Sequence, residues 1–169
     1  DLHSKDNNGE TLLHAVCVSG NLEIAQQLVD KRLNIEAKTN TKSTMLHCAT
    51  SNQNAALWQW LLDRKISLNA QDKAGQTALH LAAQTHNIAM VTWLIQNQAE
   101  LNLQNENSLT ALNIAEESRF EKIVELLLKA GAITSASNKS KQKKVEVPEL
   151  KKSSLDDLLA AIQEMHNYG

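Results

Sequence analysis

The sequence predicts an all-α solenoid, a stack of helix-turn-helix units joined by short hairpin loops, with one amphipathic helix near the C-terminus. Three observations carry this prediction. A four-residue word recurs at a fixed step of 33 residues, beginning at Thr11, Thr44, Thr77 and Thr110. Apolar residues at helical spacing follow the words, and the periodicity fades at about residue 135. A period of this length is typical of stacked small units that share a continuous core.

The period divides the 169 residues in chain order. Residues 1–5 line up with the ends of later repeats, such as 67–71 and 100–104, so we expect the chain to be a fragment of a longer repeat protein. The predicted segments are the tail of an upstream repeat (1–5), four repeats (6–38, 39–71, 72–104 and 105–137), a Lys-rich linker (138–152) and an amphipathic helix (153–167).

Each unit should hold a first helix that begins at the word, a turn and a second helix. In the first unit the turn falls at Gly20-Asn21, and the apolar residues of 22–30 cluster on one face of the second helix. Thr11 suits an N-cap, because its hydroxyl can accept a hydrogen bond from an unpaired backbone N–H. Two short helices cannot bury their apolar faces alone, so the units must stack.

The third word, Thr77-Ala-Leu-His-Leu-Ala-Ala83, resembles the T-P-L-H-x-A-A signature of ankyrin repeats, and the repeat length matches that family. The resemblance covers about residues 1–137 and implies the ankyrin solenoid. The family's Pro is absent from all four words, and several of its glycines are replaced. A non-Gly residue at positive φ costs on the order of 1 kcal/mol, so we expect modest stability and a softer second repeat. The replacements are Lys42 and Ser108 at hairpin tips, and Arg32, Lys65 and Gln98 after second helices.

Three histidines, His14, His47 and His80, recur in the word, and Asn113 takes their place in the fourth unit. As metal ligands they would have to converge, but equivalent positions of stacked helices lie roughly 10 Å apart. The resemblance implies instead that each ring hydrogen-bonds the backbone of a neighbouring loop. Asn113 fits that role because it is also a donor and an acceptor.

Trp60 and Trp93 also lie one period apart, each ahead of an apolar pair. The favoured interpretation is aromatic packing between adjacent second helices. The alternative is a partly exposed pair that anchors a partner, since Trp is enriched at binding hot spots. Trp58 lies two residues before Trp60 and should point away from it.

Composition and motif content argue against several functional classes. Residues 1–134 carry 11 Lys and Arg against 14 Asp and Glu, and an acidic stack is a poor platform for nucleic acid. No phosphate loop, catalytic-triad spacing or Cys-x-x-Cys pair is present, so we expect no enzyme, cofactor or metal site. Cys17 and Cys48 fit a reducing compartment, and no apolar run is long enough to span a membrane. We expect a cytoplasmic monomer, with the nucleus as the alternative location.

The resemblance places the binding surface on the hairpin tips and on the exposed ends of the first helices. These positions are mostly polar, which favours a peptide or a transient protein partner recognised by side-chain hydrogen bonds. An ordinary solvated surface is the alternative. The predicted binding residues are Asn40, Thr41, Ser43, Ser51, Asn52, Lys73, Gln76, Gln84, Thr85, Glu106, Asn107 and Leu109.

Beyond residue 135, six lysines and the only proline indicate a linker. Ser154-Leu-Asp-Asp157 resembles a capping box, and apolar residues at helical spacing follow it. Three interpretations of this helix are open: it covers the apolar flank of repeat four, which is favoured; it binds a groove on a partner; or it begins a further domain. The residues of its apolar face are Leu155, Leu158, Leu159, Ile162 and Met165.

Together these features predict a non-catalytic protein–protein interaction module. It would bind a peptide or protein on the hairpin-tip and first-helix face. The alternative is a regulatory or spacer segment of a larger protein, in which the helix around 155–165 is the partner-binding element.

Overall fold

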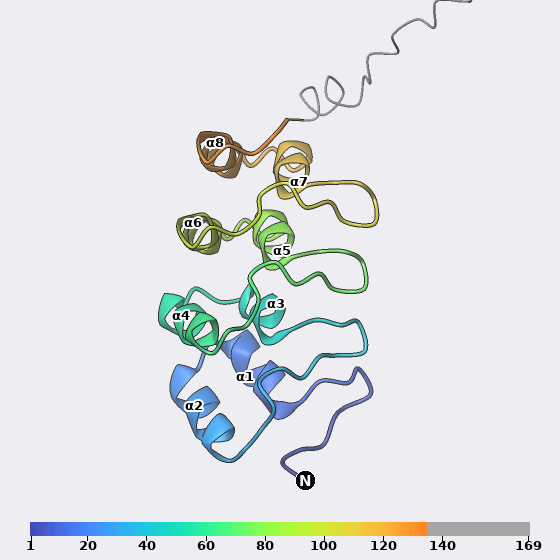
Figure 1. Cartoon of the computed structure of the whole chain (residues 1–169), viewed down its shortest axis with the longest axis vertical. Coiled ribbons are helices and arrows are strands. Elements are labelled where there is room, and N and C mark those ends of the chain that lie inside the picture. Colours follow the sequence, from blue (N-terminus) through green and yellow to red (C-terminus); the bar gives the residue numbers. More distant parts are fainter. Residues whose placement is uncertain (135–169) are drawn as a thin grey trace, which may run out of the picture. The chain divides into compact units, whose positions relative to one another are not determined.

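The computed structural model describes residues 1–134, so the predicted linker and C-terminal helix lie outside the described residues. Within 1–134 there are eight helices and no strand, which confirms the all-α prediction (Figure 1). The helices form four pairs: α1 (Leu12–Ser19) with α2 (Leu22–Asp30), α3 (Met45–Ala49) with α4 (Ala55–Asp63), α5 (Ala78–Gln84) with α6 (Ile88–Gln96), and α7 (Ala111–Glu117) with α8 (Glu121–Lys129).

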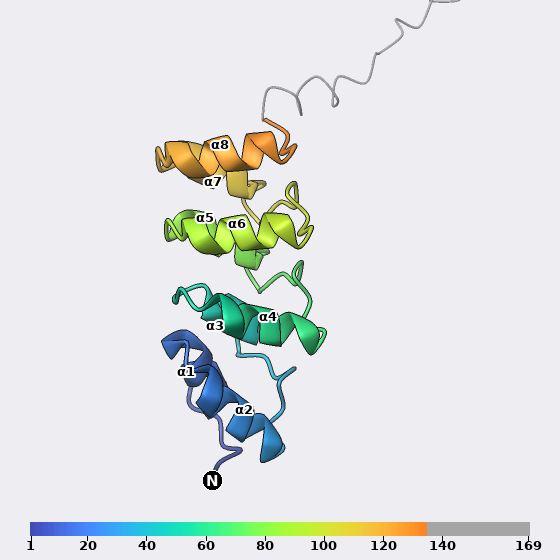
Figure 2. The ribbon, with the colours of Figure 1, turned by 90° about the vertical axis from the view of Figure 1, so that its left-hand side faces the viewer.

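The four pairs stack in chain order. In Figure 1 the first helices form one row and the second helices a parallel row, with the hairpins projecting beyond the first helices. Figure 2 shows the row of second helices from the side. The contacts agree with this arrangement, because α1 packs against α3, α5 against α7 and α6 against α8.

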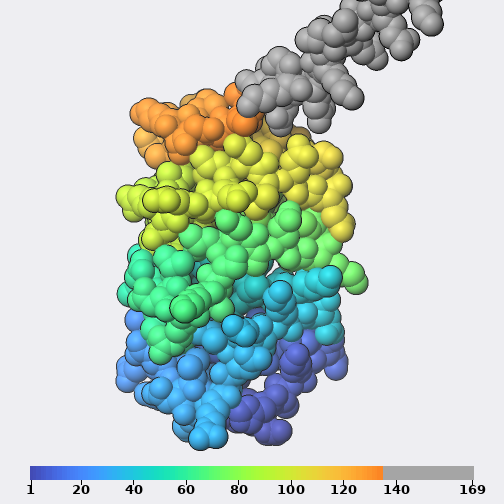
Figure 3. Space-filling model, in the orientation of Figure 1, coloured from blue at the N-terminus to red at the C-terminus, as the bar shows by residue number. Residues whose placement is uncertain are grey.

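The core is continuous because the same position of every word is buried. The third residue of each word has an exposed fraction of at most 1%, at Leu13, Leu46, Leu79 and Leu112. Burying one such side chain contributes roughly 2 kcal/mol. Figure 3 shows the repeats as successive bands in contact, with a hollow between the N-terminal segment and the loop that follows α2.

Asparagines begin the second helices of the first three repeats. The side-chain oxygens of Asn21, Asn54 and Asn87 accept hydrogen bonds from the backbone N–H groups of the first turns of α2, α4 and α6. Phe120 takes this position in the fourth repeat and supplies no side-chain cap. Each of these caps offsets the cost of unpaired N–H groups at a helix start, typically by about 1 kcal/mol.

The predicted positive φ angles are confirmed at all five replaced glycine positions, with values from 60° to 67°. Two further residues, His86 and Arg119, have φ angles of 58° and 57° where repeat one has Gly20 at 78°. Repeat two differs, because Gln53 at the equivalent position is not left-handed and α3 is only five residues long. A short first helix is consistent with a softer second repeat, which stays a prediction.

The tryptophans pack inside the stack, but not in the pair that the period indicated. Trp60 and Trp93 are 7% and 8% exposed, so the exposed-anchor alternative is wrong. The ring of Trp93 packs against Trp58 of the preceding repeat, with centroids 5.9 Å apart. Trp60 instead lies under the guanidinium group of Arg64, at 4.3 Å from its ring centroid. Trp58 is fully buried, and its Nε1 donates a hydrogen bond to the carbonyl of Ala49. Trp58 and Trp60 are both buried because two neighbouring faces of α4 are covered.

Candidate functional site

One side chain at the start of each repeat fixes the shape of its hairpin tip. In repeat three, Asp72 Oδ1 accepts hydrogen bonds from the backbone N–H groups of Ala74 and Gln76, both at 2.9 Å. Such a side-chain turn holds the chain in one conformation. The equivalent residues in the other repeats, which accept from one or two amides of their own tips, are Asp6, Thr39 and Asn105.

Neighbouring hairpin tips are joined by backbone hydrogen bonds. The N–H of Lys73 donates to the carbonyl of Thr41 at 2.8 Å, and the N–H of Glu106 donates to the carbonyl of Ala74 at 3.0 Å. The N–H of Asn40 makes the same bond to the carbonyl of Asn8 in the preceding tip. The four tips therefore form one connected edge, held by backbone hydrogen bonds that run along the stack.

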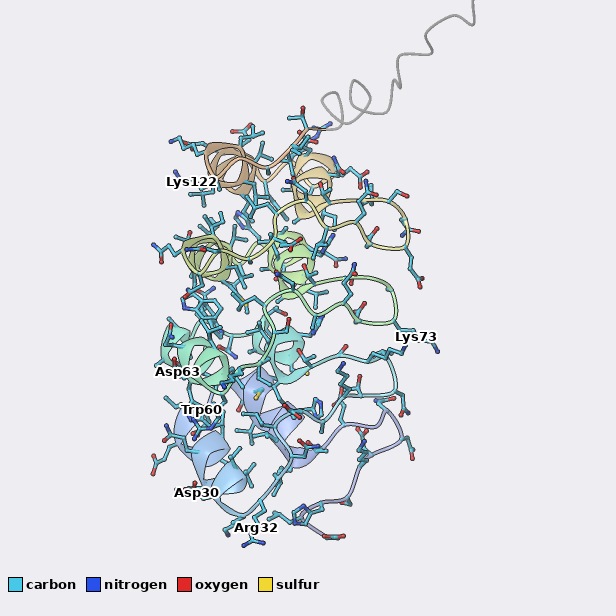
Figure 4. All side chains as sticks on the ribbon, in the orientation of Figure 1. Asp30, Arg32, Trp60, Asp63, Lys73 and Lys122 are labelled. Carbon is cyan, nitrogen blue, oxygen red and sulfur yellow. The ribbon has the colours of Figure 1, made fainter. Side chains whose placement is uncertain are left out.

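We call this surface the hairpin edge, meaning residues 7–10, 40–43, 73–76 and 106–109 with the C-terminal ends of the first helices. Its middle part contains a shallow groove of about 490 Å³. Figure 4 places Lys73 at the outer end of its hairpin, on the side opposite the second helices. Three of the predicted binding residues are brought together in this groove, whose lining is Thr41, Asp72, Lys73, Ala74 and Glu106.

The other predicted residues are distributed along the same edge. Ser51, Gln84 and Thr85 are exposed at the ends of the first helices, and Asn40 and Asn107 are exposed at the tips. Three more are half-buried, namely Ser43, Gln76 and Leu109. The four predicted tail residues, Leu155, Leu158, Leu159 and Ile162, lie outside the described residues.

Asn52 is the one predicted residue whose side chain is occupied inside the stack at both ends. Its Nδ2 donates to the carbonyl of Cys17 at 2.6 Å, and its Oδ1 accepts from Trp58 Nε1 at 3.1 Å. A partner contact would have to break one of these bonds, so we leave Asn52 out of the proposed site.

The histidines hold the hairpins against the first helices. His47 Nε2 donates to the carbonyl of Gln76 at 2.9 Å, and His80 Nε2 donates to the carbonyl of Leu109 at 3.0 Å. Each Nδ1 accepts from the backbone N–H of its own Thr, at Thr44 and Thr77, which places the ring proton on Nε2. The predicted role is confirmed for these two rings, and burial lowers the pKa of both.

His14 is the exception in this series. Its Nδ1 accepts from the N–H of Thr11 at 3.0 Å, as in the later repeats. Its side chain is fully buried, and the backbone of Ala37 and Ser43 lies near the ring, but Nε2 makes no hydrogen bond of ordinary length and angle within residues 1–134. A buried donor without a partner costs about 1–3 kcal/mol, so the first inter-repeat interface is weaker than the later ones at this point.

Two asparagines carry contacts that the sequence reasoning missed. Asn54 Nδ2 donates to the carbonyl of Gly20 at 2.8 Å. Asn87 Nδ2 donates to the carbonyls of Thr50 and Asn52 at 2.9 and 2.8 Å. Each therefore caps its own helix and also binds the preceding repeat. Their 33-residue spacing with Asn21 was a signal that could have found them.

Residues 1–134 present side chains on a surface but hold few groups suited to chemical reaction. Burial raises the pKa of the Cys17 thiol to about 12 and that of Cys48 to about 11, so neither is a thiolate at neutral pH. Between residues 1 and 134, no group of three His, Cys, Asp or Glu side chains is placed to hold a metal ion. In the same part of the chain, no helix has the length and apolar character needed to cross a bilayer.

Comparison with known proteins supports the resemblance. The model of a family described as ankyrin repeats in three copies matches residues 1–72 and 57–138. A search of curated proteins found no match.

Proposed function

The chain belongs to the ankyrin repeat family, and from this premise we propose that it binds a peptide or protein on its hairpin edge. Ankyrin repeats are generally protein–protein interaction modules and typically non-catalytic. The proposal adds the binding face and the type of partner. The partner would be an extended, polar segment recognised by side chains of the second, third and fourth tips.

The observation that carries this proposal is the groove lined by Thr41, Lys73 and Glu106. Its walls are fixed in advance, because side-chain turns and bonds between tips already order the backbone. Little free energy is then lost in ordering the receptor, which favours binding by a preformed surface. The groove is lined by one basic residue, Lys73, and two acidic residues, Asp72 and Glu106, so a segment with side chains of both charge signs would be complementary.

The test uses peptides selected against the full chain from a random displayed library. We expect the triple substitution Lys73→Ala, Gln76→Ala and Gln84→Ala to weaken the selected peptides at least tenfold without changing the melting temperature. Gln26→Ala, Gln96→Ala and Lys122→Ala is the matched control, because these exposed residues lie on the second helices. Isothermal titration calorimetry and thermal melts supply the two measurements.

Equal loss of affinity in the control and the triple variant would contradict the proposed face, and so would unchanged affinity in the triple variant. A deletion of residues 150–169 separates the alternative. If it abolishes peptide binding at unchanged melting temperature, the C-terminal segment is the binding element.

A further inference from the structure

The first repeat exposes two large apolar side chains at the N-terminal end of the stack. Leu12 on α1 is 46% exposed, and Ile24 on α2 is 43% exposed. At the equivalent positions of the later repeats, each of which packs on a preceding repeat, the exposed fraction is at most 2% (Figure 1). Leu12 and Ile24 are therefore the apolar part of a stacking surface. The equivalent residues are Met45, Ala78 and Ala111 for Leu12, and Leu57, Met90 and Ile123 for Ile24.

A backbone donor at the first hairpin tip belongs to the same surface. The N–H groups of Asn40, Lys73 and Glu106 each donate to a tip carbonyl of the preceding repeat. Asn7 holds the equivalent position in repeat one, and its N–H has no acceptor within residues 1–134. The row of bonds between tips can therefore be continued by one more carbonyl at this end.

A side-chain amide supplies a second donor. In repeats two and three, Asn54 Nδ2 and Asn87 Nδ2 donate to carbonyls at the end of the preceding first helix. Asn21 Oδ1 caps α2 in the same way as in those repeats, but among the described residues its Nδ2 makes no hydrogen bond. We call the N-terminal face the surface formed by Leu12, Ile24, the N–H of Asn7 and the side-chain amide of Asn21.

The opposite end of the stack does not complement the N-terminal face. Glu116, Glu121 and Glu125 line a groove on α7 and α8. Stacking two copies head to tail would bury these carboxylates against Leu12 and Ile24, with a large desolvation cost. Two N-terminal faces do not complement each other either, because both present donors. A second copy of the chain is therefore a poor occupant. The residues that the three glutamates replace in repeat three are Ala83, Ile88 and Thr92.

We propose that the N-terminal face binds one further ankyrin-type repeat, whose stacking surface is uncharged. Such a repeat supplies a tip carbonyl for the N–H of Asn7 and a carbonyl at the end of its first helix for Asn21. Its apolar side chains cover Leu12 and Ile24, and burial of that area stabilises the contact. The stack is thus extended at its N-terminal end, while the glutamates of repeat four oppose the same extension at the other end.

The first loop also fits this occupant. The N–H of Ser4 donates to the carbonyl of Asp1 at 3.1 Å, and the N–H of Ala37 donates to the carbonyl of Asn34 at 3.2 Å in the loop after α2. Residues 1–4 therefore form the same turn as the loop that leaves a second helix. A repeat joined ahead of Asp1 would arrive in register with repeat one.

The test adds 33 residues ahead of Asp1 in the full chain. The first extended chain carries a copy of residues 1–33, whose stacking surface packs on repeat two in the native chain. We expect it to raise the melting temperature by several degrees and to slow exchange of the Asn7 amide at least tenfold. The control extension carries the same copy with the glutamates of repeat four, and it should do neither. Its substitutions are Cys17→Glu, Leu22→Glu and Gln26→Glu in the added copy alone.

A second pair of variants tests the contact when the control extension does not fold. Leu12→Gln with Ile24→Gln in the original repeat one should abolish the gain from the first extension, yet change the unextended chain by less than half as much. Val18→Gln is the matched control, because Val18 is 45% exposed on α1 and its equivalents are exposed in every repeat. It should leave the gain unchanged.

Three results would overturn the inference. The first is equal stabilisation by both extensions, because the charge of the stacking surface would then be irrelevant. The second is an unprotected Asn7 amide in the first extended chain. The third is self-association of the unextended chain in sedimentation that Leu12→Gln with Ile24→Gln abolishes, since a second copy would then occupy this face. None of these measurements depends on a partner of the hairpin edge.

Discussion

The residues that join neighbouring repeats and the residues of the hairpin edge lie close together in the sequence. They differ in two respects, recurrence along the chain and burial. His47 and His80 recur every 33 residues, are buried and bind the loop of the next repeat. Lys73 and Glu106 stand at one equivalent pair of tip positions, are exposed and differ in charge. Residues that recur in every repeat therefore make the contacts that hold the stack together. Residues at the tips that do not recur are free to specify a partner.

We call the first group the inter-repeat network, meaning His47, His80, Asn54 and Asn87; His14 occupies the equivalent position in repeat one without a bond to the next repeat. Substitutions in this network should lower stability, whereas those at the hairpin edge should change binding alone.

The largest effect is expected from His80→Ala. It removes the bond to the carbonyl of Leu109 and leaves the N–H of Thr77 unpaired, so we expect a loss of about 3 kcal/mol in unfolding free energy. His14→Ala should cost about 1 kcal/mol, because His14 Nε2 makes no bond within the described residues. Urea unfolding measures both values. Equal losses would show that the bond to the next loop contributes nothing.

Asn87→Ala should cost about 2 kcal/mol, because it removes a helix cap together with two bonds to the preceding repeat. Asn21→Ala is the matched comparison. It removes a cap of the same geometry without a bond to another repeat, so about 1 kcal/mol is expected. Urea unfolding also tests this pair, and a larger loss for Asn21→Ala would contradict the double role of Asn87.

A smaller effect should come from pH. Burial lowers the pKa of His14, His47 and His80 in the folded state, so the unfolded chain binds protons more readily. Stability is then fully present above the ordinary histidine value of about 6.5 and is lost as pH falls below it toward the folded-state pKa. Thermal melts between pH 7.5 and 5 should show this decline. His47→Asn with His80→Asn, which introduces the residue that repeat four has at Asn113, should reduce the decline to the part that His14 contributes.

The smallest stability change is expected from Lys65→Gly, and its sign is positive. Lys65 has a φ of 64°, which glycine adopts without strain, so a gain of about 0.5–1 kcal/mol is expected. Lys31→Gly is the control, because Lys31 has a φ of −82° and glycine there only adds backbone entropy to the unfolded chain. Stabilisation by both changes would contradict the strain argument.

Most of the fold could be predicted from the sequence, but fewer of the contacts between side chains could. The period located the helices, and the missing glycines located five positive φ angles, because both depend on local backbone chemistry. The Trp58–Trp93 contact and the unpaired Nε2 of His14 depend on how one repeat is placed on the next. The 33-residue register was enough to predict that the candidate binding residues lie along one edge. It could not show that the side-chain amide of Asn52 is hydrogen-bonded to Cys17 and Trp58.

The central claim is that the non-recurring residues of the hairpin edge bind the partner. Amide NMR of the full chain, titrated with a library-selected peptide, tests it most directly. The account predicts shifts concentrated in residues 40–43, 73–76, 84–85 and 106–109, with the amides of α2, α4 and α6 unchanged. Shifts concentrated on those second helices, or confined to residues 150–169, would contradict it.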